Sequence, residues 1–102
     1  AWNFGPSSSE VRTVLQVAEH IVDRYGCGSI ISGSVEEKHH EAQLLQLNCD
    51  KSHQYLGWYP RWNFEYTLNM TSDWYRSVSN GANVCDVTRQ QLYHCYTFAS
   101  DF

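Results

Sequence analysis

An amphipathic run near the N-terminus constrains the fold more than any other part of the sequence. Between Ser7 and Gly26, apolar residues recur at steps of three and four, and they are Val11, Val14, Leu15, Ala18, Ile21, Val22 and Tyr25. This spacing places one apolar stripe along a helix. Ser7 and Glu10 have the spacing of a capping box, and Gly26 suits the left-handed residue that ends a helix. The sequence therefore predicts a helix that begins at Ser7, ends at Gly26 and buries one face.

Two more helices are predicted in the middle of the chain. Residues 63–79 place six residues on approximately one face, and they are Phe64, Leu68, Thr71, Trp74, Tyr75 and Val78. This helix should close at residues 80–81, Asn-Gly. A shorter helix is predicted over residues 50–56, with Asp50 as its cap and Gly57 as its left-handed end.

The C-terminal part predicts a last helix. Asp86 or Thr88 can cap it, and Thr88 and Gln91 have capping-box spacing. Its expected buried positions are Leu92, Cys95 and Tyr96. The residues that follow are expected to fray.

β-structure is predicted in three places. Residues 29–32 are β-branched at their centre and indicate a brief strand, with a turn over residues 33–38. Residues 42–49 alternate between apolar and polar and indicate a second, half-buried strand. Residues 1–4 can add a third. Because two strands are marginal without further support, we expect an α+β fold: one small domain, residues 1–102, with three to four helices packed on a short two- or three-stranded sheet.

Composition excludes two classes of partner. The net charge is -4, with seven Lys and Arg residues and no basic run, which argues against nucleic acid. No apolar stretch approaches the roughly 20 residues that cross a bilayer. The first six residues do not form a signal peptide. We therefore expect a cytoplasmic protein that does not bind a membrane.

The four cysteines have no metal-site or redox spacing. They are far apart and include no Cys-x-x-Cys, and they are Cys27, Cys49, Cys85 and Cys95. Free thiols are expected in a reducing compartment, whereas two disulfides would suit a secreted protein.

Several short motifs resemble one enzyme family. They are Trp2-Asn3-Phe4-Gly5-Pro6, His40-Glu41-Ala42, Cys49-Asp50-Lys51 and Leu56-Gly57-Trp58-Tyr59-Pro60-Arg61-Trp62. Leu-Gly-Trp-x-Pro is shared by many extended short-chain dehydrogenases, and the combination resembles CDP-glucose 4,6-dehydratase from Trp2 to about Tyr96. Three departures are visible: His39 stands where the family commonly has proline, Asn48 where it has aspartate, and Asp50 where it has serine.

The resemblance implies the C-terminal, nucleotide-sugar-binding lobe of an enzyme that uses NAD to oxidise CDP-glucose, eliminate water and return the hydride. The sequence has no G-x-G-x-x-G, which a dinucleotide-binding turn needs, and no Tyr-x-x-x-Lys. We therefore expect no catalytic residues and no cofactor in this chain, and either self-association as a homo-oligomer or a missing Rossmann lobe as its partner. Two alternatives to this function stay open. The chain can be a structural protein, or it can be the tail of an active dehydratase that a separate Rossmann chain completes.

The resemblance also implies substrate-binding residues for a CDP-hexose. His40 and Glu41 match a loop that reaches the nucleotide in extended short-chain dehydrogenases, and His and carboxylate side chains suit phosphate and ribose. Arg61 can pair with a phosphate or with a nearby carboxylate, and the second is favoured. A metal site at residues 39–41 is disfavoured because adjacent side chains diverge. Four aromatic residues are expected in the core rather than against a ligand, and they are Trp58, Tyr59, Trp62 and Trp74. The remaining histidines, His20, His53 and His94, are expected on helix surfaces.

Overall fold

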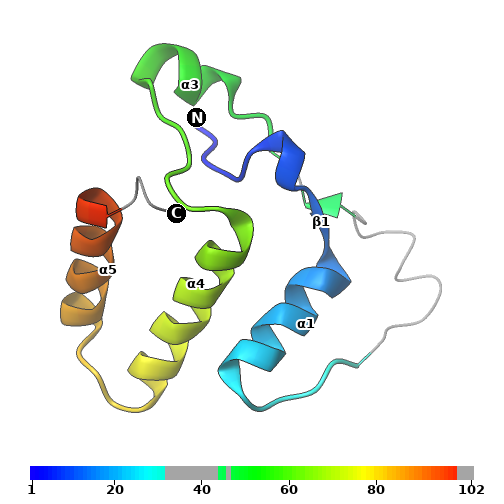
Figure 1. Cartoon of the computed structure of the whole chain (residues 1–102), viewed down its shortest axis with the longest axis vertical. Helices are drawn as coiled ribbons and strands as arrows, with labels where there is room; N and C mark the ends of the chain where they lie inside the picture. The colour runs from blue at the N-terminus through cyan, green and yellow to red at the C-terminus, as the bar shows by residue number, and fades with distance from the viewer. Residues whose placement is uncertain (32–43, 46, 99–102) are drawn as a thin grey trace.

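A computed structural model describes residues 1–31, 44–45 and 47–98 of the chain (Figure 1). The described elements, in chain order, are the 3-10 turn η1 (Ser8–Glu10), the strand β1 (Arg12–Thr13), the helix α1 (Val14–Tyr25), the strand β2 (Leu44–Leu45) and the helices α3 (Asp50–Leu56), α4 (Phe64–Ser79) and α5 (Val84–Phe98).

The described chain is mostly helical, so the expected α+β fold with helices on a sheet is wrong. The β-structure consists of one antiparallel pairing, Arg12 with Leu45 and Thr13 with Leu44. Each strand is two residues long. The helices pack on one another, and such a short ladder offers no face to cover.

The other predicted β-structure is absent wherever the structure describes it. Residues 1–4 and 29–31 have no regular structure, and Ile31 is almost fully exposed. Strand propensity depends on a neighbouring strand to pack against, and none lies there among the described residues. Ser32, the turn over 33–38 and residues 42, 43 and 46 lie outside the described residues.

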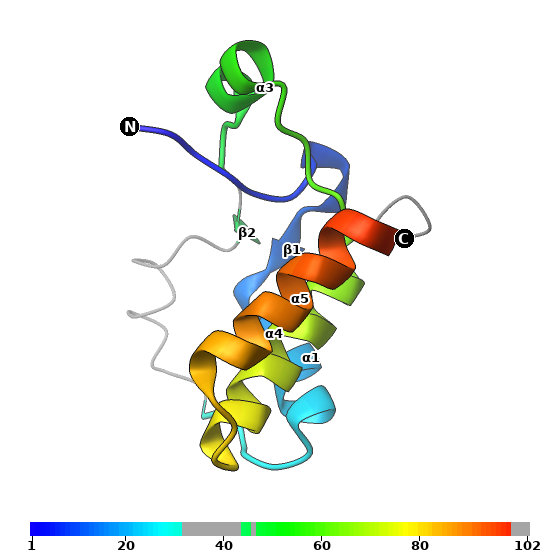
Figure 2. The ribbon, with the colours of Figure 1, turned by 90° about the vertical axis from the view of Figure 1, so that its left-hand side faces the viewer.

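Three helices form one layer. In Figure 1, α4 lies in the middle with α1 and α5 on either side, and Figure 2 shows the same three helices edge-on behind one another. The short helix α3 lies away from this layer, beside the N-terminal residues. Trp2 contacts the Tyr55 ring edge-on, and the Ser52 hydroxyl donates to the carbonyl of Asn3 at 2.7 Å.

Polar contacts join α1 to α4. His20 Nε2 lies 2.6 Å from Asn69 Oδ1, so His20 links two helices and is half-buried, contrary to the exposed position expected for it. Arg24 donates to both carboxylate oxygens of Asp73, at 3.0 and 2.9 Å. This hydrogen bonding, together with the charge attraction, raises the pKa of Arg24. Both side chains are well exposed, so the pair contributes little to stability.

The helix α5 begins earlier than expected, at Val84. The side chain of Asn83 accepts from the backbone N–H of Asp86, so Asn83 takes the capping role that was assigned to Asp86 or Thr88. Thr88 instead accepts a hydrogen bond from Trp74 Nε1 at 2.9 Å, which joins α4 to α5. Leu92 and Tyr96, expected to be buried, are exposed, because α4 covers the other side of α5.

The two central helices match the sequence closely. α3 has the predicted bounds, and Gly57 follows it in the left-handed conformation with φ of 64°. The cap of α3 is Cys49 without a side-chain bond, and not Asp50. α4 begins at Phe64, with the Asn63 side chain as its cap, one residue after the predicted start. It ends at Ser79 with Asn80 as its C-cap, as predicted.

The start of α1 was predicted six residues too early. Thr13 and Gln16 form the capping box, while Ser7 makes no side-chain cap bond and residues 8–10 form η1. The helix ends at left-handed Gly26, as predicted. The reason is a competing long-range contact: the Glu10 carboxylate accepts from the backbone N–H of Phe64 at 3.3 Å.

Mutation can show whether Ser7 or Thr13 caps the start of α1. We expect Thr13→Ala to lower the free energy of unfolding by about 1 kcal/mol, because an N-cap side chain is lost. Ser7→Ala should change it by less than about 0.5 kcal/mol, as for other exposed positions. Urea unfolding followed by circular dichroism measures both, and equal effects would contradict the assignment of Thr13.

The buried core is small. Among the described residues, the buried apolar side chains are Cys49 and Phe64, and the buried polar ones are Ser52 and Ser72. The four cysteines are free in this structure. No helix in the described ranges is long and apolar enough to cross a membrane.

Candidate functional site

Arg61 is the predicted site residue that the structure describes, and it lies in the connection between α3 and α4. His40 and Glu41 lie outside the described residues, as does His39. Arg61 Nε donates to the carbonyl of Cys95 at 3.2 Å. Its guanidinium lies over the Tyr96 ring, 5.0 Å from the ring centre. Among the described residues no carboxylate pairs with Arg61, so its favoured pairing with a carboxylate stays a prediction.

Arg61 borders a cavity of about 410 Å³, which we call the aromatic pocket. The N-terminal segment, the connection after α3, the first turns of α4 and the end of α5 all contribute to it. Its lining residues are Phe4, Gly5, Pro6, Trp58, Pro60, Arg61, Trp62, Phe64, Thr67, Leu68, Cys95 and Tyr96. Segments far apart in the sequence are therefore needed to build one pocket.

The aromatic pocket combines flat apolar walls with one charge. Phe4 packs edge-on against Trp58, with ring centres 5.1 Å apart. Among the described residues that line it, Arg61 is the one charged side chain. Its Nη groups make no hydrogen bond within the described chain, since the bond to Cys95 uses Nε. They can therefore donate to an anion.

Trp62 adds a buried polar atom to the wall of the aromatic pocket. Its Nε1 is buried and has no hydrogen-bond partner among the described residues. The Trp62 ring packs edge-on against Tyr66, with centres 5.2 Å apart, and Tyr66 OH in turn lies 2.5 Å from His94 Nε2. The prediction that Trp62 lies in the core is therefore only partly correct, because its half-buried ring also borders the aromatic pocket.

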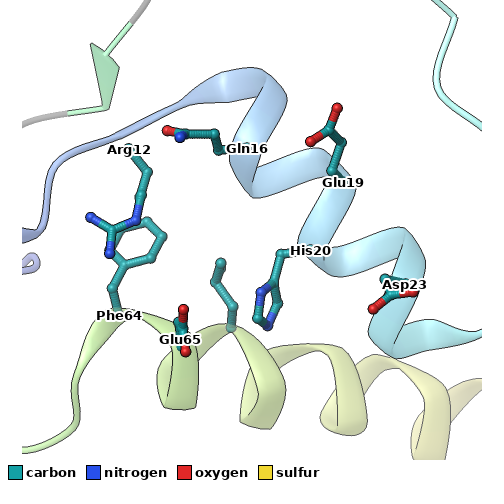
Figure 3. Close-up of a pocket in the computed structure, with 8 residues that line it drawn as sticks. Arg12, Gln16, Glu19, His20, Asp23, Phe64 and Glu65 are labelled. Carbon is teal, nitrogen blue, oxygen red and sulfur yellow. The ribbon is translucent and has the colours of Figure 1, made fainter.

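A second cavity, the polar groove, lies between α1 and α4 and has a volume of about 500 Å³ (Figure 3). Figure 3 shows Arg12 against the Phe64 ring and His20 reaching from α1 toward α4. Three carboxylates line this groove, those of Glu19, Asp23 and Glu65. One arginine does not offset them, so the groove disfavours a phosphate.

His53 packs within an aromatic cluster. Its ring stacks on Tyr59 with centres 4.5 Å apart and lies parallel to Trp58 at 6.4 Å. It is therefore half-buried, contrary to the helix-surface position expected for it. Within the described ranges, no three His, Cys, Asp or Glu side chains are arranged to hold a metal ion.

The described glycines do not form a dinucleotide-binding turn. Such a turn joins the end of a strand to the start of a helix. Gly26, Gly57 and Gly81 have positive φ and follow helices, and Gly28 with positive φ lies just beyond α1. Within the described ranges, therefore, the glycines show no turn of this kind.

The sequence offers Arg61 as a candidate site residue, but most of the residues that line the cavity around it were not predicted to lie together. The one sequence feature that indicates an aromatic pocket is the high share of aromatic residues, which make up 15% of the chain. Phe4 and Tyr96 could not be assigned to the same site, because nothing local in the sequence brings the N-terminus to the last helix.

Comparison with known proteins finds a distant relationship. Over 91 residues the chain is 30% identical to the CDP-glucose 4,6-dehydratase of Salmonella typhimurium. The aligned region is 89% of this chain, and the chain spans about a quarter of that relative's length, 25%. No family model and no solved structure matches the chain. The chain is thus distantly related to CDP-glucose 4,6-dehydratase.

Proposed function

We propose that this chain is a nucleotide-sugar-binding lobe of the CDP-glucose 4,6-dehydratase type, which binds a CDP-hexose weakly and has no dehydratase activity by itself. The observation that carries the proposal is the aromatic pocket with its single arginine, in a chain distantly related to a dehydratase of CDP-glucose. The relative acts on a nucleotide sugar by its name, and the ligand class is taken from it.

The chemistry of the aromatic pocket suits such a ligand in two parts. A pyrimidine or sugar ring can lie against Trp58 or Trp62, since aromatic side chains offer large rigid surfaces. A diphosphate can accept hydrogen bonds from the free Nη groups of Arg61, and such charge-assisted bonds are the strong ones. The volume of about 410 Å³ falls within the roughly 300–1,000 Å³ of small-molecule sites.

The weakness of the expected binding also follows from the pocket. It is open to solvent on the side of Arg61, whose side chain is exposed. A charge in contact with water gains less from pairing than a buried one. We therefore expect a dissociation constant near the millimolar range, which corresponds to about -4 kcal/mol.

The test is isothermal titration of the chain with CDP-glucose and with CDP. We expect measurable heat with both ligands. Arg61→Ala should weaken binding about tenfold, because a charged hydrogen bond contributes roughly 1.5–3 kcal/mol. The matched control is Arg76→Ala, which removes an exposed arginine of α4 that is remote from the lining residues.

Two results would contradict the proposal. An absence of heat at millimolar CDP-glucose would contradict the proposed binding. Equal effects of Arg61→Ala and Arg76→Ala would show that the ligand does not bind in the aromatic pocket. Incubation with CDP-glucose and NAD, followed by mass spectrometry, should return the sugar nucleotide unchanged. A product lighter by one water would show that the chain is itself a dehydratase.

A further inference from the structure

A third cavity, of about 700 Å³, lies beside the short helix α3, and we call it the α3 cavity. Residues 6–8, residues 47–50 and the connection after α3 contribute to its lining. Pro6 and Pro60 line both this cavity and the aromatic pocket, so the two cavities adjoin. A ligand with two dissimilar ends can therefore occupy both cavities at once.

The α3 cavity offers polar side chains, whereas the aromatic pocket offers mostly rings. A hydroxyl, an amide and a carboxylate line the α3 cavity, from Ser8, Asn48 and Asp50. Within the described ranges, the Asp50 carboxylate has no hydrogen-bond or ion-pair partner. An ionised carboxylate accepts hydrogen bonds and donates none, so this wall suits a ligand that is rich in hydroxyl groups.

An aromatic ring forms another part of the same lining. Tyr59 stacks on His53 with one face, yet it is 62% exposed, so its other face is open. Such a ring is a large, rigid surface on which the C–H face of a sugar can pack. The buried Nε2 atom of His53, which also borders this cavity, has no hydrogen-bond partner among the described residues. Buried polar atoms normally have a partner, and a ligand hydroxyl can supply one.

We propose that the α3 cavity binds the hexose of the nucleotide sugar, while the aromatic pocket binds the base and Arg61 binds the diphosphate. This assignment rests on the proposed function, which leaves open which end of the ligand lies in which place. Charge decides the direction: the Asp50 carboxylate repels a diphosphate and accepts from sugar hydroxyls, and the Arg61 guanidinium attracts the diphosphate. Asp50 and Tyr59 are thus the residues that distinguish a nucleotide sugar from a nucleotide.

The test is NMR titration of the ¹⁵N-labelled chain with CDP-glucose and, separately, with CDP. We expect CDP-glucose to shift backbone amide signals in both cavities, including those of Ser8 and Asp50, and CDP to shift those of the aromatic pocket alone. Asp50→Asn should weaken CDP-glucose binding about fivefold, because a charge-assisted hydrogen bond becomes a neutral one. It should not weaken CDP binding, since removing a negative charge can only favour an anion.

Asp86→Asn is the matched control for Asp50→Asn. Both carboxylates belong to the first turn of a helix, and Asp86 lines neither cavity. We therefore expect Asp86→Asn to change the affinity for neither ligand. An equal loss of CDP-glucose affinity in the two variants would overturn the assignment of Asp50.

A second variant tests the hexose site without changing its charge. Tyr59→Ala removes an exposed ring, so circular dichroism should stay unchanged while CDP-glucose binding weakens several-fold more than CDP binding. If both ligands bind but neither Asp50→Asn nor Tyr59→Ala acts selectively on CDP-glucose, the hexose site is wrong and the proposed function stands. An absence of shifts with either ligand would contradict both.

Discussion

Replacing Phe64 by alanine is expected to lower the free energy of unfolding by about 3–5 kcal/mol, the range for large-to-small changes at buried aromatic positions. Phe64 is one of two buried apolar side chains in the described chain. Arg12 covers its ring, with the guanidinium carbon 5.4 Å from the ring centre. Its backbone N–H donates to Glu10, so Phe64 also fastens the segment before α1 to the start of α4.

Such a loss is large for a protein of this size. Natural domains have about 5–15 kcal/mol of stability in total, and few other buried side chains can compensate here. We therefore expect Phe64→Ala to lose its cooperative urea transition or to unfold at much lower urea. The matched control is Tyr75→Ala, an exposed aromatic of the same helix, which should lose less than about 1 kcal/mol. Similar transitions for the two variants would show that Phe64 is not the centre of the core.

The two buried serines should respond in opposite directions to the same substitution. Ser52 is fully buried, and its hydroxyl lies 2.7 Å from the carbonyl of Asn3 and 2.9 Å from that of Cys49. Ser52→Ala removes both hydrogen bonds, while the Cys49 carbonyl keeps the backbone N–H of His53 as a donor, so we expect a loss of about 1 kcal/mol. It should also release the N-terminal segment from α3.

Ser72 is as buried as Ser52, but its Oγ has no hydrogen-bond partner among the described residues. An unpaired buried hydroxyl is unfavourable, and alanine has the higher helix propensity. We therefore expect Ser72→Ala to raise the free energy of unfolding by about 1 kcal/mol. Urea unfolding of the two variants side by side provides the test. A destabilised Ser72→Ala would mean that the hydroxyl is bonded in solution.

The elements that could be predicted are those whose boundaries are encoded locally. Asn63 accepts from the N–H of Tyr66 and fixes the start of α4, and Gly57 supplies the left-handed residue that ends α3. These signals act within four residues, so the sequence alone is sufficient. The start of α1 was predicted at Ser7, whereas Thr13 is the residue that caps it. The Glu10 carboxylate, which the capping box at Ser7 required, bonds instead to the backbone N–H of Phe64, 54 positions away.

The sheet and the aromatic pocket could not be predicted for the same physical reason. Whether residues 29–31 form a strand depends on a partner elsewhere in the chain, and the local pattern carries no information about it. Arg61 was identified through a family motif, yet its bond to Cys95 spans 34 positions. The expected partners were a phosphate or a carboxylate, and the acceptor found among the described residues, the Cys95 carbonyl, is brought to Arg61 by the packing of α5.

The position of Arg61 has a consequence for regulation. One guanidinium both bonds to the last turns of α5 and borders the aromatic pocket, and the Tyr96 ring lies beneath it. A ligand that binds Arg61 in the pocket would therefore be coupled to the packing of α5. By reciprocity, whatever a ligand does to the stability of that packing, the packing must do to the affinity for the ligand.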